Sequence, residues 1–156
     1  MDQAQVDELL ERLAATPGRI ATATVGQHPE ALAGAPSDDA WSAVAVLAHL
    51  RASDDILAPR LVAMLVRDEP ALPAFDDRRW AEVMGYPDND FQDLLATFTF
   101  RRAELVRALR RVTSPAWERT GLHEVQGRIT LVATLRHLVE HEAEHCTQIE
   151  ALFAAH

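Results

Sequence analysis

The sequence contains no lysine, so arginine supplies all 15 of its basic side chains, against 24 aspartates and glutamates and a net charge of -9. A chain without lysine cannot form a Schiff base or supply the lysine of a phosphate-binding P-loop, which excludes two large classes of enzyme chemistry. The negative charge argues against nucleic acid, because phosphate binding needs a surplus of basic side chains. We therefore expect a small-molecule partner and no nucleic acid.

Cysteine is almost as scarce, since Cys146 is the only one. A single cysteine forms no intramolecular disulfide and no cysteine-based zinc finger, and this usage fits a reducing compartment. The first residues lack the basic and apolar segments of a signal peptide, and the longest nearly apolar run, 40–50, is far shorter than a membrane span. These absences predict a cytoplasmic protein with no membrane partner.

Apolar residues recur three and four positions apart over long stretches, and no alternating pattern bounded by turn residues indicates a β-strand. This periodicity predicts one all-α domain over 1–156, a four-helix bundle with helices at 3–25, 40–67, 91–112 and 128–155. We expect Thr16-Pro17 to kink or break the first helix and Pro59 to kink the second. Prolines and glycines over 68–89 predict a long crossover between the second and third helices.

Two histidines interrupt the apolar stripe of the last predicted helix. His141 and His145 are four residues apart, a spacing that lets both rings face one metal ion. The alternative is a structural pair, but burying two imidazoles without partners costs desolvation twice. His49, on the inward face of the second predicted helix, is the candidate third ligand. Three imidazoles with open coordination positions suit Zn, Ni or Fe(II) and predict a catalytic or substrate-binding centre.

Two other metal chemistries match parts of the same segment. Residues 141–145 read H-E-x-x-H, the motif of zincin metallopeptidases with Glu142 as general base. The extended motif would need glycine at Gln148 and histidine at Ala151, and no predicted strand is available to align a peptide. A di-iron carboxylate bundle would need a second E-x-x-H motif and further carboxylates. Both stay as less favoured alternatives.

Several other polar residues have more than one interpretation. Asp54 and Asp55 are candidates to orient a ligand or complete the coordination, with solvated surface carboxylates as the commoner alternative. We interpret Cys146 as a packing residue of the core. The remaining histidines outside the last helix are predicted at the surface: His28, His123 and His156.

The order of several residues resembles the DinB-like (DinB/YfiT-type) superfamily of metal-binding four-helix bundles: Trp41, Ser42, His49, His141, His145 and Gln148. Trp117, Gly121, Gly127 and Thr130 fit its loop and cap, so the likeness spans most of the chain. It implies a bundle with a long crossover, a divalent-metal site at the three histidines and a homodimer. Characterised members include thiol-dependent enzymes that use mycothiol or bacillithiol, such as S-transferases and a maleylpyruvate isomerase.

This chain departs from the common family pattern at Glu144, where a further histidine often stands, and at Cys146-Thr147, where Arg-Gly is frequent. We hypothesise that the metal lowers the pKa of a water or a low-molecular-weight thiol and presents it to a small electrophile. Glu142 or His137 is the candidate catalytic base. Arg101 or Arg102 is the candidate for binding a carboxylate of the cofactor or substrate. The alternative function is a non-catalytic metal-binding stress-response bundle.

Overall fold

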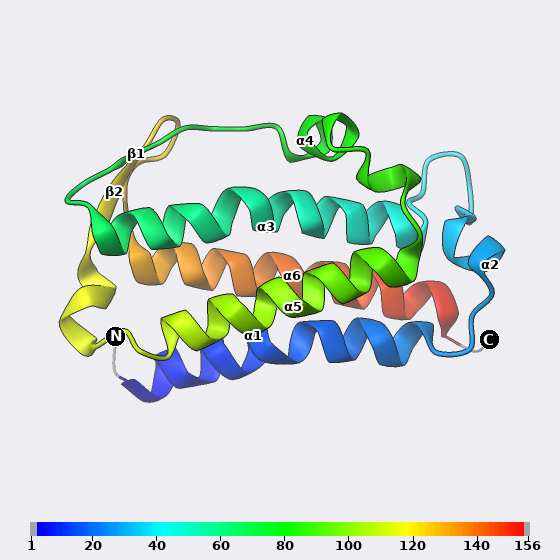
Figure 1. The fold of residues 1–156 in the computed structure, drawn as a ribbon, viewed down its shortest axis with the longest axis horizontal. Coiled ribbons are helices and arrows are strands. Elements are labelled where there is room, and N and C mark those ends of the chain that lie inside the picture. The colour runs from blue at the N-terminus through cyan, green and yellow to red at the C-terminus, as the bar shows by residue number, and fades with distance from the viewer. Residues whose placement is uncertain (1–2, 155–156) are drawn as a thin grey trace.

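The computed structural model describes residues 3–154 and contains four long helices: α1 (Gln3–Thr24), α3 (Ala43–Val66), α5 (Phe91–Leu109) and α6 (Leu131–Phe153). They run alongside one another as a bundle (Figure 1). Both α1 and α3 pack against α5 and α6, so that α1 and α3 take diagonal positions. The all-α class and the four-helix bundle predicted from the periodicity are confirmed.

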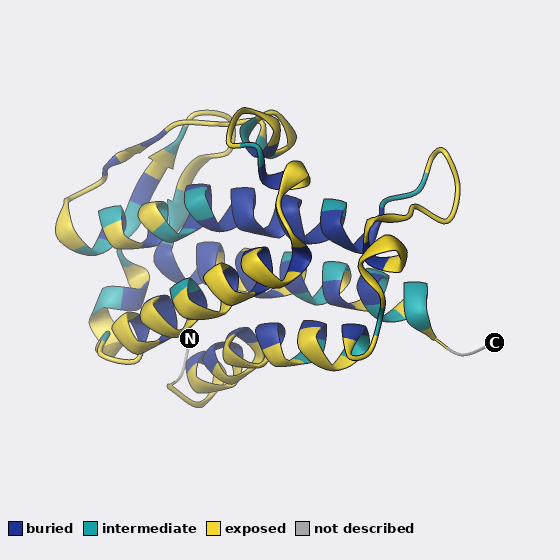
Figure 2. Ribbon diagram, turned by 45° about the vertical axis from the view of Figure 1, so that its right-hand side comes forward, coloured by how far each residue is buried: buried dark blue, intermediate teal, exposed yellow. Residues whose placement is uncertain are grey.

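The core lies between the inward faces of these helices, which Figure 2 shows as dark blue stripes with exposed residues on the outside. Apolar side chains form two clusters along the bundle. One includes Leu13, Leu61, Leu105 and Leu131, and the other includes Ile20, Leu47, Phe98 and Ile149. Along α5 and α6, the charged residues Arg102 and Glu142 stand between the stretches that supply the two clusters.

Side-chain caps decide where the helices begin. The Ser42 hydroxyl accepts a hydrogen bond from the Ala45 amide at 3.1 Å, and the Thr130 hydroxyl accepts one from the Ala133 amide at 3.1 Å. Each bond satisfies an amide that has no partner within the first turn of a helix. The predicted starts at 40 and 128 therefore shift to 43 and 131.

The first helix is not broken at Thr16-Pro17, in contrast to one of the two outcomes expected there. Helix α1 continues through Pro17, and the Thr16 hydroxyl donates to the Arg12 carbonyl at 3.5 Å instead of capping a new helix. Both residues are buried, and α1 packs along α6 and α5. This packing offsets the amide hydrogen bond that proline cannot donate.

The long crossover predicted between α3 and α5 is present and contains the short helix α4 (Asp77–Val83) and the 3₁₀ turn η1 (Tyr86–Asp88). Figure 1 shows it passing along the outside of α3. Asp55 of α3 anchors it, accepting hydrogen bonds from the Tyr86 hydroxyl at 2.5 Å and the Trp80 indole N–H at 3.3 Å. The crossover is therefore fixed against α3 near the middle of the bundle.

A small sheet corrects the expectation that the chain has no strands. Strand β1 (Ala71–Leu72) pairs in parallel with β2 (Thr120–His123), which pairs antiparallel with β3 (Gly127–Thr130). Strands of two and four residues are too short for an alternating pattern to stand out in the sequence. Gly121 permits the packing, because a Cβ atom there would lie 2.6 Å from Leu72 Cδ1.

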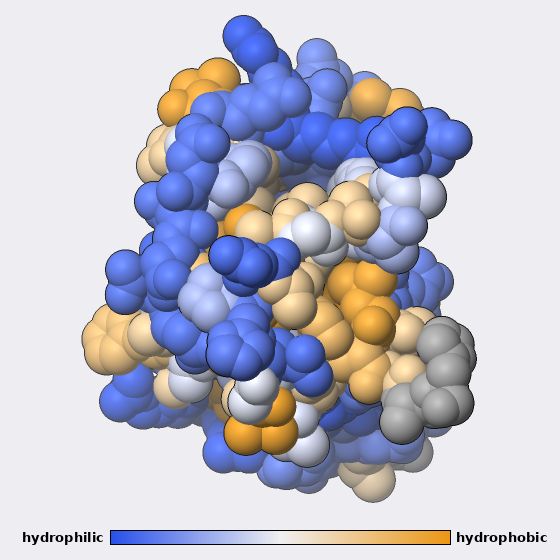
Figure 3. Space-filling model, turned by 90° about the vertical axis from the view of Figure 1, so that its right-hand side faces the viewer, coloured by the Kyte–Doolittle hydropathy of each residue, from blue (hydrophilic) through white to orange (hydrophobic). Residues whose placement is uncertain are grey.

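Two shorter elements complete the described chain: α2 (Pro29–Ala33) and the 3₁₀ turn η2 (Ser114–Glu118). Within residues 3–154, no helix combines the length and the apolar character that a membrane span requires. Figure 3 views the end of the bundle that carries α2 and the last turns of α6, where hydrophobic surface is framed by hydrophilic residues.

Candidate metal centre

The structure brings His49 of α3 together with His141 and His145 of α6. Each offers one ring nitrogen to a group whose ligand atoms all lie within 4.8 Å of one another. The Nε2 atoms of His49 and His141 are 2.9 Å apart, and the ring centroids of His49 and His145 are 4.6 Å apart. We call these three residues the histidine cluster. Two helices thus deliver the imidazoles that the i, i+4 spacing and His49 predicted.

The outer nitrogens of two of these rings face polar side chains. His145 Nδ1 lies 2.9 Å from Gln148 Oε1, one turn later on α6, and His49 Nδ1 lies 3.6 Å from a carboxylate oxygen of Asp77 on α4. Ser53 donates to the same Asp77 oxygen at 3.3 Å. Acceptors at Nδ1 favour the tautomer with the proton there, which leaves the Nε2 lone pair free. We assign this tautomer to His145, whereas the 3.6 Å between His49 Nδ1 and Asp77 is too long for a hydrogen bond.

Burial disfavours the charged forms of His49 and His141. Burial, followed by the neighbouring imidazoles, lowers the pKa of His141 to about 4. The pKa of His49 is also lowered, first by burial and then by His145 and Arg78, although the negative charge of Asp77 opposes the shift. Neutral imidazole is the form that binds a metal ion. His49 and His141 are therefore in the form that can bind a metal ion at neutral pH.

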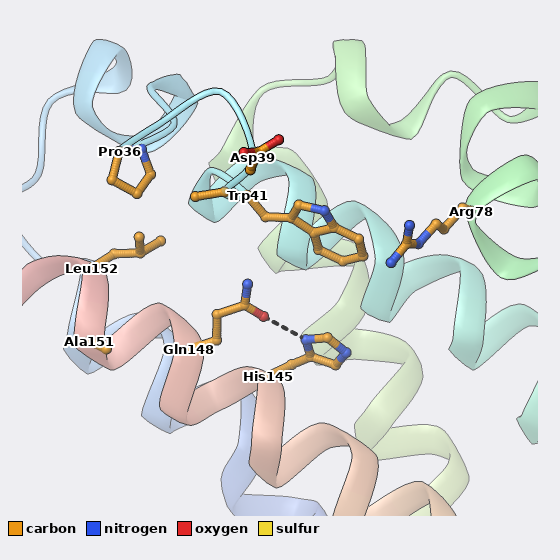
Figure 4. Close-up of a pocket in the computed structure, with 9 residues that line it drawn as sticks. Pro36, Asp39, Trp41, Arg78, His145, Gln148, Ala151 and Leu152 are labelled. Carbon is orange, nitrogen blue, oxygen red and sulfur yellow. Dashed lines mark hydrogen bonds between the residues drawn. The ribbon is translucent and has the colours of Figure 1, made fainter.

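Trp41, directly before the cap of α3, covers the histidine cluster. Its ring stacks parallel to His145 with the centroids 6.0 Å apart and meets His49 edge to face at 5.2 Å. A cavity of about 560 Å³ opens beside Trp41 and His145. Figure 4 shows Trp41, His145, Gln148 and Arg78 around it. A small molecule in this cavity would lie next to His145.

Glu142, the candidate base, is not part of the histidine cluster. Its side chain is 1% exposed and forms an ion pair with Arg102 of α5, whose side chain is also 1% exposed. Burial raises the pKa of Glu142 to about 7, and the positive charge of Arg102 opposes this shift. On a helix, the residue next to a ligand points about 100° away from it, which explains why Glu142 faces the core between α5 and α6.

Arg101, the candidate binding residue, also has partners away from the histidine cluster. Its Nε lies 2.9 Å from Asp54 and its Nη2 lies 2.9 Å from Asp55, both on α3. Asp54 is 1% exposed and Asp55 only partly exposed, so neither is a solvated surface carboxylate. We call the following residues the charged cluster: Arg51, Asp54, Asp55, Arg101, Arg102 and Glu142.

The remaining singled-out residues lie outside the histidine cluster. Cys146 is buried, as interpreted from the sequence, and burial raises the pKa of its thiol to about 12, so it stays protonated. His28 is exposed, while His123 is only partly exposed at the end of β2, and His156 lies outside the described residues. His137 is exposed on α6, with its ring centroid 6.1 Å from that of His141.

Sequence reasoning missed Asp77 and Arg78, both in the first turn of α4. The local signal was Asp76, which caps α4 by accepting from the Arg79 amide at 3.0 Å. That signal predicts a helix start, but the approach of α4 to His49 depends on how the crossover folds back over α3. Only the tertiary structure shows this.

Comparisons with known proteins relate the chain to one family. The sequence model of the DinB superfamily matches residues 12–149. A protein of Oceanobacillus iheyensis, named as a candidate metal-dependent hydrolase, is 21% identical over 147 residues, covering 93% of this chain and 83% of the relative. The structure of YfiT from Bacillus subtilis, described as a probable metal-dependent hydrolase with an unusual four-helix bundle topology, superposes with a TM-score of 0.88. It is 24% identical, and the match covers 97% of this chain and 87% of YfiT.

Proposed function

The chain belongs to the DinB superfamily, and we propose that it is a metal-dependent enzyme acting on small molecules, with a divalent ion held by His49, His141 and His145. The observation that carries this proposal is the convergence of three imidazoles beside an open cavity. Zn, Ni and Fe(II) suit a ligand set of nitrogen atoms.

The surroundings of the histidine cluster fit a metal ion. His49 and His141 point Nε2 at each other at 2.9 Å, and at most one of these atoms carries a proton to donate. His141 Nδ1 has no hydrogen-bond partner in the part of the chain that the structure describes. Gln148 meanwhile supports the outer nitrogen of His145, as partners of metal-binding histidines do, and the Asp77 carboxylate lies 3.6 Å from the outer nitrogen of His49.

The residues around the histidine cluster would have three different roles. Asp77 and Gln148 orient His49 and His145, Trp41 excludes water from one side, and the cavity positions the substrate beside His145. An ion held by His49, His141 and His145 would supply a nucleophile by lowering the pKa of a water or a thiol. Glu142 and Arg101 take no part in this proposal, because the charged cluster holds both side chains.

Water is the nucleophile we favour, because the names of two similar proteins describe metal-dependent hydrolases. A low-molecular-weight thiol in the same position would make the protein an S-transferase. A homodimer in the cytoplasm stays a prediction.

Metal content tests the proposal. We expect plasma mass spectrometry of tag-free wild-type protein to find about one equivalent of Zn, Ni or Fe per chain, as one three-ligand site requires. His49→Ala and His145→Ala should both lose this metal. His137→Ala, an exposed histidine on the same helix, is the matched control and should keep it. Metal retained in His49→Ala would contradict a site shared by α3 and α6.

Turnover separates an enzyme from a non-catalytic metal-binding bundle. We expect the metal-loaded protein to hydrolyse members of a panel of small esters and amides, and to lose this activity in His145→Ala. Parallel assays with bacillithiol, mycothiol or cysteine and an alkylating electrophile identify a transferase. Absence of metal-dependent turnover in every assay would favour the non-catalytic alternative, and cleavage of peptides alone would favour the metallopeptidase.

A further inference from the structure

Arg78 is the only arginine among the residues that line the cavity beside the histidine cluster. Its guanidinium carbon lies 4.7 Å from the ring centroid of Trp41, so the indole supports it from one side. Over residues 3–154, no carboxylate forms an ion pair with it, whereas the neighbouring Arg79 pairs with Glu82 at 2.9 Å. Arg78 therefore presents an unpaired cation to the cavity.

Gln148 adds hydrogen-bond donors on another side of the same cavity. With a metal ion at Nε2, His145 must carry its proton on Nδ1, and the Gln148 oxygen 2.9 Å away must accept it. The amide nitrogen then points away from His145. Figure 4 shows this nitrogen directed into the space below Trp41. The orientation of Gln148 thus follows from the proposed ligand role of His145.

We infer that the cavity binds small molecules with an anionic group, a carboxylate or a phosphate, held by Arg78 and the Gln148 amide next to the histidine cluster. This inference rests on the proposed function and names its substrate class. A guanidinium donates in a planar fork that matches two oxygen atoms of a carboxylate or a phosphate. Stacking on Trp41 restrains that fork before the ligand arrives, which reduces the entropy lost on binding.

The rest of the lining allows a ligand with one charged end. Asp39 is the only carboxylate among the lining residues, and Figure 4 places it on the Pro36 side of Trp41, away from Arg78. Pro36, Ala151 and Leu152 supply apolar contacts. An anion at Arg78 with an apolar remainder toward Leu152 therefore agrees with the charge and polarity on each side.

The test compares anionic and neutral probes of one shape. Phenylacetate, phenyl phosphate and the neutral phenylacetamide are titrated calorimetrically into metal-loaded and metal-stripped wild-type protein, Arg78→Gln and Arg79→Gln. Arg79 is the matched control, because it is the next residue of α4 and does not line this cavity. Metal content is measured on every sample. The more tightly bound of the two anions tells whether a carboxylate or a phosphate is preferred.

We expect wild type and Arg79→Gln to bind at least one anion about tenfold more tightly than phenylacetamide, as a charge-assisted hydrogen bond provides. Arg78→Gln should lose this preference while keeping its metal and its affinity for phenylacetamide. An anion preference that survives in Arg78→Gln, or no preference in wild type, would overturn the inference. If wild type fails to take up any metal but still shows an Arg78-dependent preference for anions, the proposed function would be overturned and the anion site would stand.

Discussion

The histidine cluster and the charged cluster are both sets of buried polar side chains, but they differ in where their partners come from. In the charged cluster every carboxylate faces at least one guanidinium of the same chain. In the histidine cluster the inner nitrogens face only one another. Burial of polar groups is costly unless they are paired. The difference teaches that ion pairs within the chain hold the first set together, while the second has a place for an ion.

Arg102→Met should give the largest effect, and it should fall on stability. Removing one partner of a buried ion pair leaves Glu142 and Asp54 with uncompensated charge, which costs about 3–5 kcal/mol of unfolding free energy. Urea denaturation measures this. Arg110→Met is the control, because its ion pair with Glu11 is exposed and contributes at most about 1 kcal/mol.

The folded fraction of Arg102→Met should still bind one equivalent of metal. The double change Arg102→Met with Glu142→Leu should recover much of the lost stability, since an apolar pair can replace a buried ion pair. Loss of metal from the folded variant would show that the two clusters are not separate.

Asp77→Asn should leave the fold intact and weaken metal binding about 10–100-fold, because it removes the negative charge 3.6 Å from the outer nitrogen of His49. Competition with a chelator of known affinity measures the change. Asp76→Asn is the matched control on the neighbouring residue, and asparagine there still caps α4. Equal losses in both variants would argue against a specific role of Asp77.

The two clusters should shift stability in opposite directions with pH in metal-free protein. Burial raises the pKa of Glu142 to about 7, so between pH 4.5 and 7 the folded state holds more protons and unfolding free energy falls as pH rises. Burial lowers the pKa of His141 to about 4, so between pH 4 and 6.5 the unfolded state holds more protons and unfolding free energy rises.

Wild type should therefore show a shallow pH profile between pH 4.5 and 6.5. In Glu142→Gln the unfolding free energy should rise with pH, and in His141→Ala it should fall with pH. Each slope should reach up to about 1.4 kcal/mol per pH unit. Urea denaturation in the presence of EDTA across this range checks both. Identical profiles in the two variants would contradict the assigned shifts.

Tyr86→Phe should give the smallest effect. It removes one of several donors to Asp55, so unfolding free energy should fall by only about 1 kcal/mol in thermal or urea denaturation. Metal affinity should fall less than in Asp77→Asn, because the Trp80 indole still holds the crossover. A larger loss of affinity would place this anchor within the metal site.

The sequence predicted the fold more completely than it predicted the surroundings of the site. Long amphipathic helices repeat their pattern over many turns, so their number and order could be read, whereas strands of two to four residues could not. The i, i+4 spacing of His141 and His145 fixes their common face on any helix. Whether Glu142 or Arg101 faces that site depends on where the oppositely charged partner lies. The partner of Glu142 is on α5 and the partner of Arg101 is on α3, so neither side chain joins the histidine cluster.

The sequence by itself therefore determined an all-α bundle and three imidazoles capable of meeting, because helical periodicity is a local property that the chain carries everywhere. Only the tertiary structure decided which polar residues surround those imidazoles. Asp77 and Arg78 lie far along the chain from His49 and His145, and the crossover brings them close through its contacts with α3. Contacts between distant segments depend on packing, and no local pattern records them.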